Sequence, residues 1–100
     1  MEHGYVYMLT NDRLNVTYVG STSDLHKRLV HHKRRLIPGF TKKYNVRRLM
    51  WFERHPDMDA ARCRERQLKG LSREKKEELI QAANPDRRDL FDDVRQLTEL

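Results

Sequence analysis

Two short runs of β-branched and aromatic residues constrain the fold of this chain more than any other feature. They span residues 5–9 (YVYML) and 16–20 (VTYVG), and the polar, turn-forming stretch 10–15 lies between them. Two such runs joined by a short polar connection predict an antiparallel β-hairpin. A third run at 46–53 (VRRLMWFE) has the composition of another strand, although its pattern does not fix a register.

The remaining periodicity predicts helices. Leu25, Leu29, His32 and Leu36 recur on one helical face, with N-cap residues before them and Pro38-Gly39 as the end of the helix. Two further helices are predicted over 58–68 and 73–83, and a short one near 90–97. Their caps and stops are Asp57 and Gly70 for the first, and Ser72 and Asn84-Pro85 for the second.

Three short strands with three or four helices predict a compact α/β domain of the α+β kind, with a small antiparallel sheet. The 100 residues suffice for a single domain, with a core over about 4–84 and a C-terminal extension at 85–100. The one cysteine excludes an internal disulfide and a cysteine-based zinc site. No apolar run approaches the roughly 20 residues that cross a bilayer, so we expect a soluble cytoplasmic protein without a membrane partner.

The positive charge is concentrated in one segment. The net charge is +6, and residues 26–54 hold ten basic side chains and one acidic side chain, while residues 1–25 and 84–100 are net acidic. A local excess of this kind predicts a surface that faces a polyanion such as nucleic acid. The alternative is a solvated basic surface.

Two predicted helices carry a polar residue inside an apolar stripe. His32 falls between Leu25 and Leu36, with Arg28 one turn earlier at the edge of the stripe. This places an imidazole and a guanidinium where helix meets sheet, unless His32 is only a core histidine with one hydrogen bond.

The second such residue is Glu65, which lies on the line of Met58, Ala61 and Leu68. A buried carboxylate must be paired, protonated or bound to a cation. An internal salt bridge to Arg28 is one interpretation. A magnesium ion, which often uses only one or two protein carboxylates, is the other.

The tyrosines of the hairpin have two interpretations. Tyr5 and Tyr7 share one face of the first strand, and Tyr18 shares a face with Gly20 on the second. Aromatic residues on paired strands usually form core or cross-strand contacts. Gly20 indicates a close approach, either of packed side chains or of a phosphate.

Five elements then occur in order: YVY at 5–7, YVG at 18–20, a helix with Arg28 and His32, CRERQLKG at 63–70, and NPDRRDL at 84–90. This ordered set resembles the GIY-YIG nuclease superfamily over residues 4–90. In particular it resembles the small stand-alone bacterial members, which also carry a GFTKKYN-like loop (39–45) and an NP-x-x-RDL end (84–90). One departure is that Tyr5 stands where the first family motif has glycine, with Gly4 one place earlier.

The resemblance implies a three-stranded antiparallel sheet flanked by helices, and a metal-dependent endonuclease. It implies catalytic roles for Tyr7, Tyr18, Arg28 and His32, one Mg²⁺ or Mn²⁺ ion on Glu65, and contacts to nucleic acid near Gly20, Lys27 and Asn84. In similar enzymes a motif tyrosine is the general base and the arginine contacts the phosphate. A phenol has a pKa near 10, so its use as phenolate at neutral pH costs roughly 4 kcal/mol unless cations reduce that cost.

The residues themselves suggest further contacts with nucleic acid. The basic side chains that could bind phosphates are Lys33, Arg34, Arg35, Lys42, Lys43, Arg47 and Arg48. Phe40, Tyr44 and Trp51 could stack on bases or belong to the core. We expect DNA rather than RNA, recognised by structure rather than by sequence. A binding module without efficient catalysis, and a partner protein that docks an acidic surface, are the alternative hypotheses.

Overall fold

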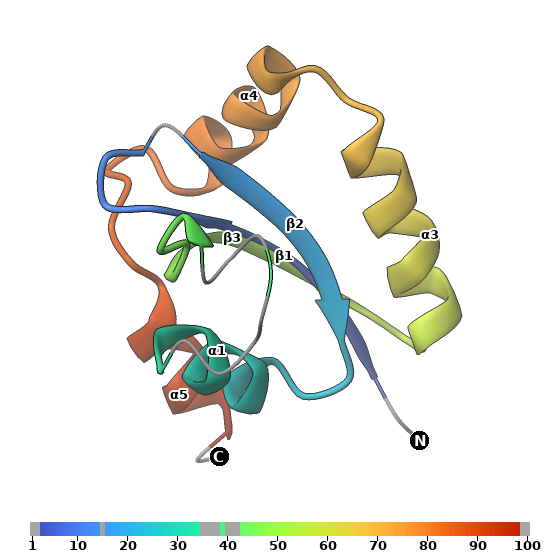
Figure 1. The fold of residues 1–100 in the computed structure, drawn as a ribbon. Helices are drawn as coiled ribbons and strands as arrows, with labels where there is room; N and C mark the ends of the chain where they lie inside the picture. The colour runs from blue at the N-terminus through green and yellow to red at the C-terminus, as the bar shows by residue number, and fades with distance from the viewer. Residues whose placement is uncertain (1–2, 15, 35–38, 40–42, 99–100) are drawn as a thin grey trace.

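The predicted hairpin forms two strands of a three-stranded antiparallel sheet (Figure 1). The computed structural model describes residues 3–14, 16–34, 39 and 43–98. The strands are β1 (Gly4–Thr10), β2 (Thr17–Thr22) and β3 (Arg48–His55). Their order is β2-β1-β3, so β1 is central and β2 lies at an edge. The fold class predicted from the sequence is confirmed.

Helices cover both faces of this sheet. They are α1 (Leu25–Lys33), α3 (Met58–Lys69), α4 (Arg73–Ala83) and α5 (Phe91–Thr98). The predicted N-caps are confirmed: the side chains of Asp57 and Ser72 accept hydrogen bonds from the backbone N–H groups of Ala60 and Lys75. Asp24 caps α1 in the same way. In the described part of the chain, no helix has the length and apolar composition needed to span a bilayer.

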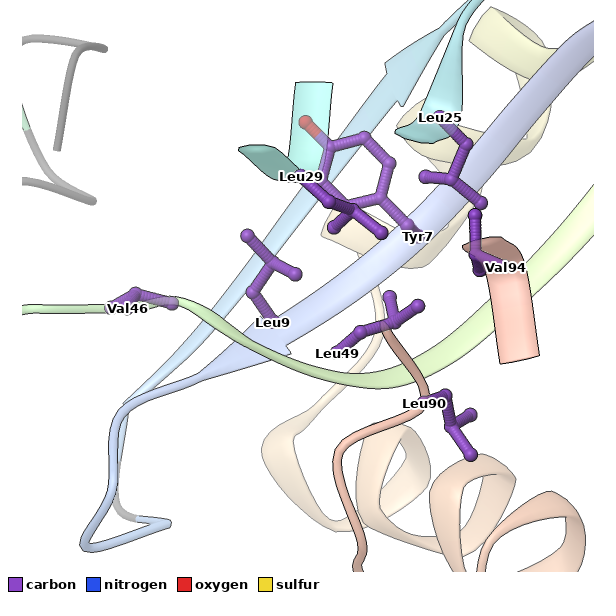
Figure 2. Close-up of a cluster of buried hydrophobic side chains, with 8 residues drawn as sticks. All are labelled: Tyr7, Leu9, Leu25, Leu29, Val46, Leu49, Leu90 and Val94. Atoms are coloured by element: carbon purple, nitrogen blue, oxygen red, sulfur yellow. The ribbon is translucent and has the colours of Figure 1, made fainter. Parts of the chain in front are cut away.

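Each face of the sheet has its own hydrophobic cluster. On the α1 face, the buried residues are Tyr7, Leu9, Leu25, Leu29, Val46, Leu49, Leu90 and Val94 (Figure 2). On the α3 face, they are Val6, Met8, Val19, Met50, Trp51, Leu68 and Ile80. Alternation along β1 divides its side chains between the two clusters.

A β-bulge explains why the sequence pattern did not fix the register of β3. Met8 pairs with Trp51 and Leu9 pairs with Leu49, so Met50 is an extra residue between them. Because of this extra residue, Met50 and Trp51 both join the α3-face cluster. Of the two interpretations of Trp51, base stacking or a place in the core, the structure supports the core.

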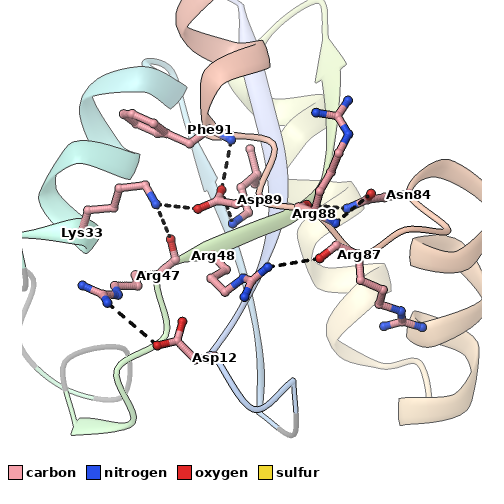
Figure 3. A network of polar contacts seen from close by, with 10 residues as sticks. Asp12, Lys33, Arg47, Arg48, Asn84, Arg87, Arg88, Asp89 and Phe91 are labelled. Carbon is pink, nitrogen blue, oxygen red and sulfur yellow. Dashed lines mark hydrogen bonds and ion pairs between the residues drawn. The ribbon is translucent and has the colours of Figure 1, made fainter.

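The segment after α4 is part of the core rather than an extension beyond it. Asp89 accepts hydrogen bonds from Lys33 Nζ at 2.6 Å and from the backbone N–H groups of Leu49 and Phe91 (Figure 3). The backbone N–H of Leu90 donates to the carbonyl of Leu49 at 2.9 Å. Asp89 thus connects α1, β3 and the start of α5, and the hydrophobic core extends past residue 84.

Candidate active site

Three aromatic rings from three different elements meet on the α1 face. Tyr7 comes from β1, Tyr18 from β2 and His32 from α1. The ring centroids lie 6.3 Å apart for the two tyrosines, 5.9 Å for Tyr7 and His32, and 5.7 Å for Tyr18 and His32. The structure therefore brings together three of the four catalytic residues that the resemblance implies.

Gly20 provides the space that these rings need. It is the residue of β2 that pairs with Tyr7 on the neighbouring strand β1. A Cβ atom at this position would lie 2.6 Å from the hydroxyl of Tyr7 and 3.0 Å from Cε1 of Tyr18. Of the two interpretations of this glycine, the structure favours close side-chain packing, because the phenol of Tyr7 fills the space that a side chain would occupy.

Tyr7 and His32 form a buried, neutral pair. The Tyr7 hydroxyl lies 3.2 Å from Nε2 of His32. Burial raises the pKa of Tyr7 well above its usual range, and the neighbouring Tyr18 adds to this effect while the charge of Arg28 opposes it. Burial also lowers the pKa of His32 to about 4, with further contributions from Arg28 and His31. At neutral pH neither group is charged, so Tyr7 is a poor general base.

One atom of this pair lacks a partner. Nδ1 of His32 is buried and, within the described ranges, makes no hydrogen bond. Buried polar atoms are nearly always hydrogen-bonded, and an exception in a native protein often marks a functional site. By contrast, Tyr18 is half-buried, which makes it the tyrosine of the cluster that water can reach more easily.

Glu65 contacts β2 next to Gly20, but from the α3 face of the sheet. Its Oε1 accepts a hydrogen bond from the Ser21 hydroxyl, and its Oε2 lies 2.6 Å from Nζ of Lys69. Ser21 pairs across the sheet with Val6, which belongs to the α3-face cluster. The residues to which the resemblance assigns catalytic and metal-binding roles therefore lie on both sides of the edge strand, around Gly20 and Ser21.

The surroundings of Glu65 keep it ionised. Burial acts to raise the pKa of its carboxyl group. This effect is outweighed by the hydrogen bonds from Lys69 and Ser21 and by the charges of Lys69 and Arg28, and the net pKa is lowered. The predicted direct salt bridge to Arg28 is not the one that forms, because Lys69 is the ion-pair partner of Glu65.

The donor set near Glu65 suits a cation that needs few protein ligands. In the part of the chain that the structure describes, no three His, Cys, Asp or Glu side chains are grouped closely enough to hold a metal ion. Mg²⁺ fits such a site, because it is commonly bound by one or two carboxylates and completes its shell with water and phosphate oxygens. An ionised, partly exposed carboxylate meets that requirement.

The predicted basic residues differ in their surroundings. Lys27 and Arg28 line a hollow with His31 at the start of α1, close to the ring cluster. Lys33 is paired with Asp89, and Arg47 lies 3.9 Å from Asp12, whereas Arg34 and Lys43 are exposed. Arg48 donates to the carbonyl of Arg87. Arg35 and Lys42, like Phe40, lie outside the described residues.

Asn84 does not lie at this site. Its side chain is buried, donates to the carbonyls of Met50 and Arg88, and accepts from the backbone N–H of Arg88. The bond to Met50 joins the end of α4 to β3, and the two bonds with Arg88 hold the turn that follows α4. The prediction that Asn84 contacts nucleic acid is therefore corrected: its contacts are structural, and they connect the end of α4 to the following turn.

Sequence reasoning missed several residues around Glu65. Arg62, Arg66 and Lys69 line a hollow with Glu65, and Lys69 and Lys76 line another with Tyr18. The signal was present in the helical spacing, since Lys69 is four residues after Glu65 and lies on the same face. Ser21 had no such signal, because its contact depends on how α3 packs on β2.

Two comparisons with known proteins agree with this geometry. A family model described as the GIY-YIG catalytic domain matches residues 3–78. The solution NMR structure of the UPF0213 protein BH0048 from Bacillus halodurans is similar with 30% sequence identity and a TM-score of 0.51, over 80% of this chain and 84% of that one. A comparison with curated protein sequences gave no match.

Proposed function

We propose that this chain, which belongs to the GIY-YIG catalytic domain family, is a divalent-metal-dependent endonuclease that hydrolyses phosphodiester bonds in DNA. Membership of the family supports a nuclease-type function. The metal dependence, the preference for DNA and the recognition of structure rather than sequence are our proposals.

One observation carries the proposal: phenol, imidazole, guanidinium and carboxylate groups converge around Gly20 on the edge strand. Tyr18 and His32 lie on one side of β2 and Glu65 on the other, and the charge of Arg28 acts on groups on both sides. A surface that only binds phosphates needs lysines and arginines. It has no use for a buried histidine with an unpaired nitrogen or for a carboxylate that repels phosphate.

The proposed roles follow from burial and charge. Tyr18, the more exposed tyrosine of the cluster, takes the proton of the attacking water, and Arg28 binds the scissile phosphate. Tyr7 and His32 stay neutral and hold the ring of Tyr18 in place. Glu65 would hold the divalent ion, which supplies charge stabilisation at the phosphate when bound. A phenolic base predicts a rate that rises with pH through the neutral range.

The substrate assignment rests on the placement of charge. Lys27 and Arg28 line the hollow on one side of β2, and Arg62, Arg66 and Lys69 line one on the other. Phosphates on both sides of the cut could thus be held by point charges, which recognise the backbone and not the bases. Affinity should fall steeply with salt, with a slope set by the number of phosphates contacted.

The test is cleavage of labelled duplex, single-stranded, flapped and branched DNA with Mg²⁺ or Mn²⁺. The variant is Glu65→Gln, which keeps the size of the side chain and removes its charge. The matched control is Glu78→Gln, at an exposed position on α4. We expect Glu65→Gln to cut at least about 100-fold more slowly while it still binds DNA, and Glu78→Gln to cut at the rate of the native chain.

The second candidate is a nucleic-acid-binding module, favoured by the basic segment 26–54. Salt-sensitive binding by the native chain, with no cutting of any of the four DNA shapes under either metal, would replace the nuclease by this module.

A further inference from the structure

Both oxygens of the Glu65 carboxylate already have a partner. Oε1 accepts the Ser21 hydroxyl, and Oε2 is 2.6 Å from the ammonium of Lys69. A divalent cation on this carboxylate would therefore meet a positive charge within hydrogen-bond distance. We propose that Lys69 competes with the metal for Glu65 and that its release from Glu65 couples metal binding to nucleic-acid binding. This inference rests on the proposed function.

The contact between Lys69 and Glu65 is of a kind that can open. The two residues are four apart on α3, and 54% of the Lys69 side chain is exposed. Exposed ion pairs at this spacing are weak, because water solvates the ammonium well and the long side chain loses freedom when it is held. A divalent cation, with twice the charge, can displace the lysine from such a pair.

The surface around Lys69 gives the displaced ammonium a place to bind. Lys69 lines two hollows, one shared with Tyr18 and Lys76 and the other with Arg62 and Arg66. Apart from Glu65, the charged side chains that line these hollows are all basic. An incoming phosphate group would supply the anion that the ammonium lacks once the metal holds Glu65.

The metal ion and the phosphate both require Lys69 to leave Glu65, so the binding of one makes the binding of the other more favourable. The metal binds Glu65 only when Lys69 has left, and a phosphate binds Lys69 only when it has left Glu65. Each ligand therefore raises the affinity of the other by the same factor, as thermodynamic linkage requires. Lys69 thus weakens metal binding by the free protein, and bound nucleic acid removes that effect.

The experiment measures Mn²⁺ affinity by isothermal titration calorimetry, with and without a short duplex that carries phosphorothioate linkages. Lys69→Met keeps an apolar stem and removes the charge, and Lys75→Met, at an exposed position of α4, is the matched control. Without DNA we expect Lys69→Met to bind Mn²⁺ about two- to fivefold tighter than the native chain, the range that an exposed ion pair corresponds to. With DNA, we expect the gain in Mn²⁺ affinity to be smaller in Lys69→Met than in the native chain and in Lys75→Met.

The outcomes separate this inference from the proposed function. Glu65→Gln reports whether Mn²⁺ uses this carboxylate at all. If its Mn²⁺ affinity equals that of the native chain, the metal site and the coupling both fail. If Glu65→Gln loses Mn²⁺ binding but Lys69→Met binds Mn²⁺ no tighter than the native chain, or keeps the full gain from DNA, the coupling is overturned and the nuclease proposal stands. Lys69→Arg, which restores the charge, should behave as the native chain does.

Discussion

The two faces of the sheet share the same strands but differ in the side chains that they bury. On the α3 face the buried cluster is made of apolar side chains, among them Met8, Leu68 and Ile80. On the α1 face the apolar residues surround Tyr7 and His32, and burial shifts the pKa values of both. Within the described chain, Nδ1 of His32 also lacks a hydrogen-bond partner. Burying such groups costs stability that an apolar residue would not cost. The comparison indicates that the α3-face cluster secures the fold, whereas the α1-face cluster gives up some stability by burying a phenol and an imidazole.

The largest expected effect comes from breaking the apolar face. Leu68→Ala removes a fully buried side chain and should lower the free energy of unfolding by about 2 to 5 kcal/mol. Guanidinium denaturation measures this loss. Cleavage per folded molecule, measured where the variant is still folded, should stay near the native rate. A loss of activity in fully folded protein would show that the packing of Leu68 also positions Glu65, which lies on the same helix.

The pH dependence of stability tests the α1 face. His32 has a pKa of about 4 in the fold and an ordinary value of 6.5, so between these two pH values the unfolded chain binds more protons than the folded one. Stability should be full above pH 6.5 and should fall by up to about 3 kcal/mol as the pH drops to 4. Denaturation curves of the native chain and of His32→Phe measure this effect. The variant should lose that part of the slope, and an unchanged slope would mean that His32 is not buried in its neutral form.

An intermediate effect is expected where the rings meet the strand. Gly20→Ala places a Cβ atom against the Tyr7 hydroxyl and ring, so the ring must move within a packed cluster. Overpacking of this kind typically costs about 1 to 3 kcal/mol. Differential scanning calorimetry measures the loss in stability, and cleavage should fall as well because the tyrosine cluster is displaced. If Gly20→Ala has the stability and the activity of the native chain, the Tyr7 ring does not need the space that Gly20 leaves.

The smallest effect on stability is expected from Tyr7→Phe. It removes one hydrogen bond and leaves Nε2 of the buried His32 without this partner, so the free energy of unfolding should fall by about 1 kcal/mol, the lower end of the cost of an unsatisfied buried group. Cleavage should fall less than in Tyr18→Phe, for which the loss of a general base predicts about 100-fold or more. If Tyr7→Phe is the slower enzyme, the roles that we propose for the two tyrosines are reversed.

Local signals in the sequence were enough for most of the fold. The hairpin, the caps at Asp57 and Ser72, and the end of α3 at Gly70 all depend on residues a few positions apart. The bulge at Met50 was not predictable, because it depends on how β3 fits two clusters at once. The contacts of Asp89 with Lys33 and Leu49 join residues 56 and 40 positions apart and have no local signature.

The sequence predicted which residues belong to the candidate site, but not which of them contact one another. Polar residues in apolar stripes pointed to His32 and Glu65, since a buried polar group needs a reason. The partners of Glu65 were missed because the sequence suggested Arg28 and the structure uses Lys69 and Ser21. Which of two nearby cations pairs with a carboxylate depends on the packing of α3 against β2, and no periodicity contains that information.

Asp89 lies close to the C-terminal end of the sequence, and this affects how the chain folds during its synthesis on the ribosome. The hairpin of β1 and β2 can form as soon as it emerges, but β1 remains unpaired on its other edge until β3 (Arg48–His55) has also emerged. The contacts that lock α1 onto the sheet through Asp89, Leu90 and Val94 come last. Nascent chains that stall before these residues should expose an incomplete core, and their handling by chaperones or proteases should change abruptly once Val94 has left the exit tunnel.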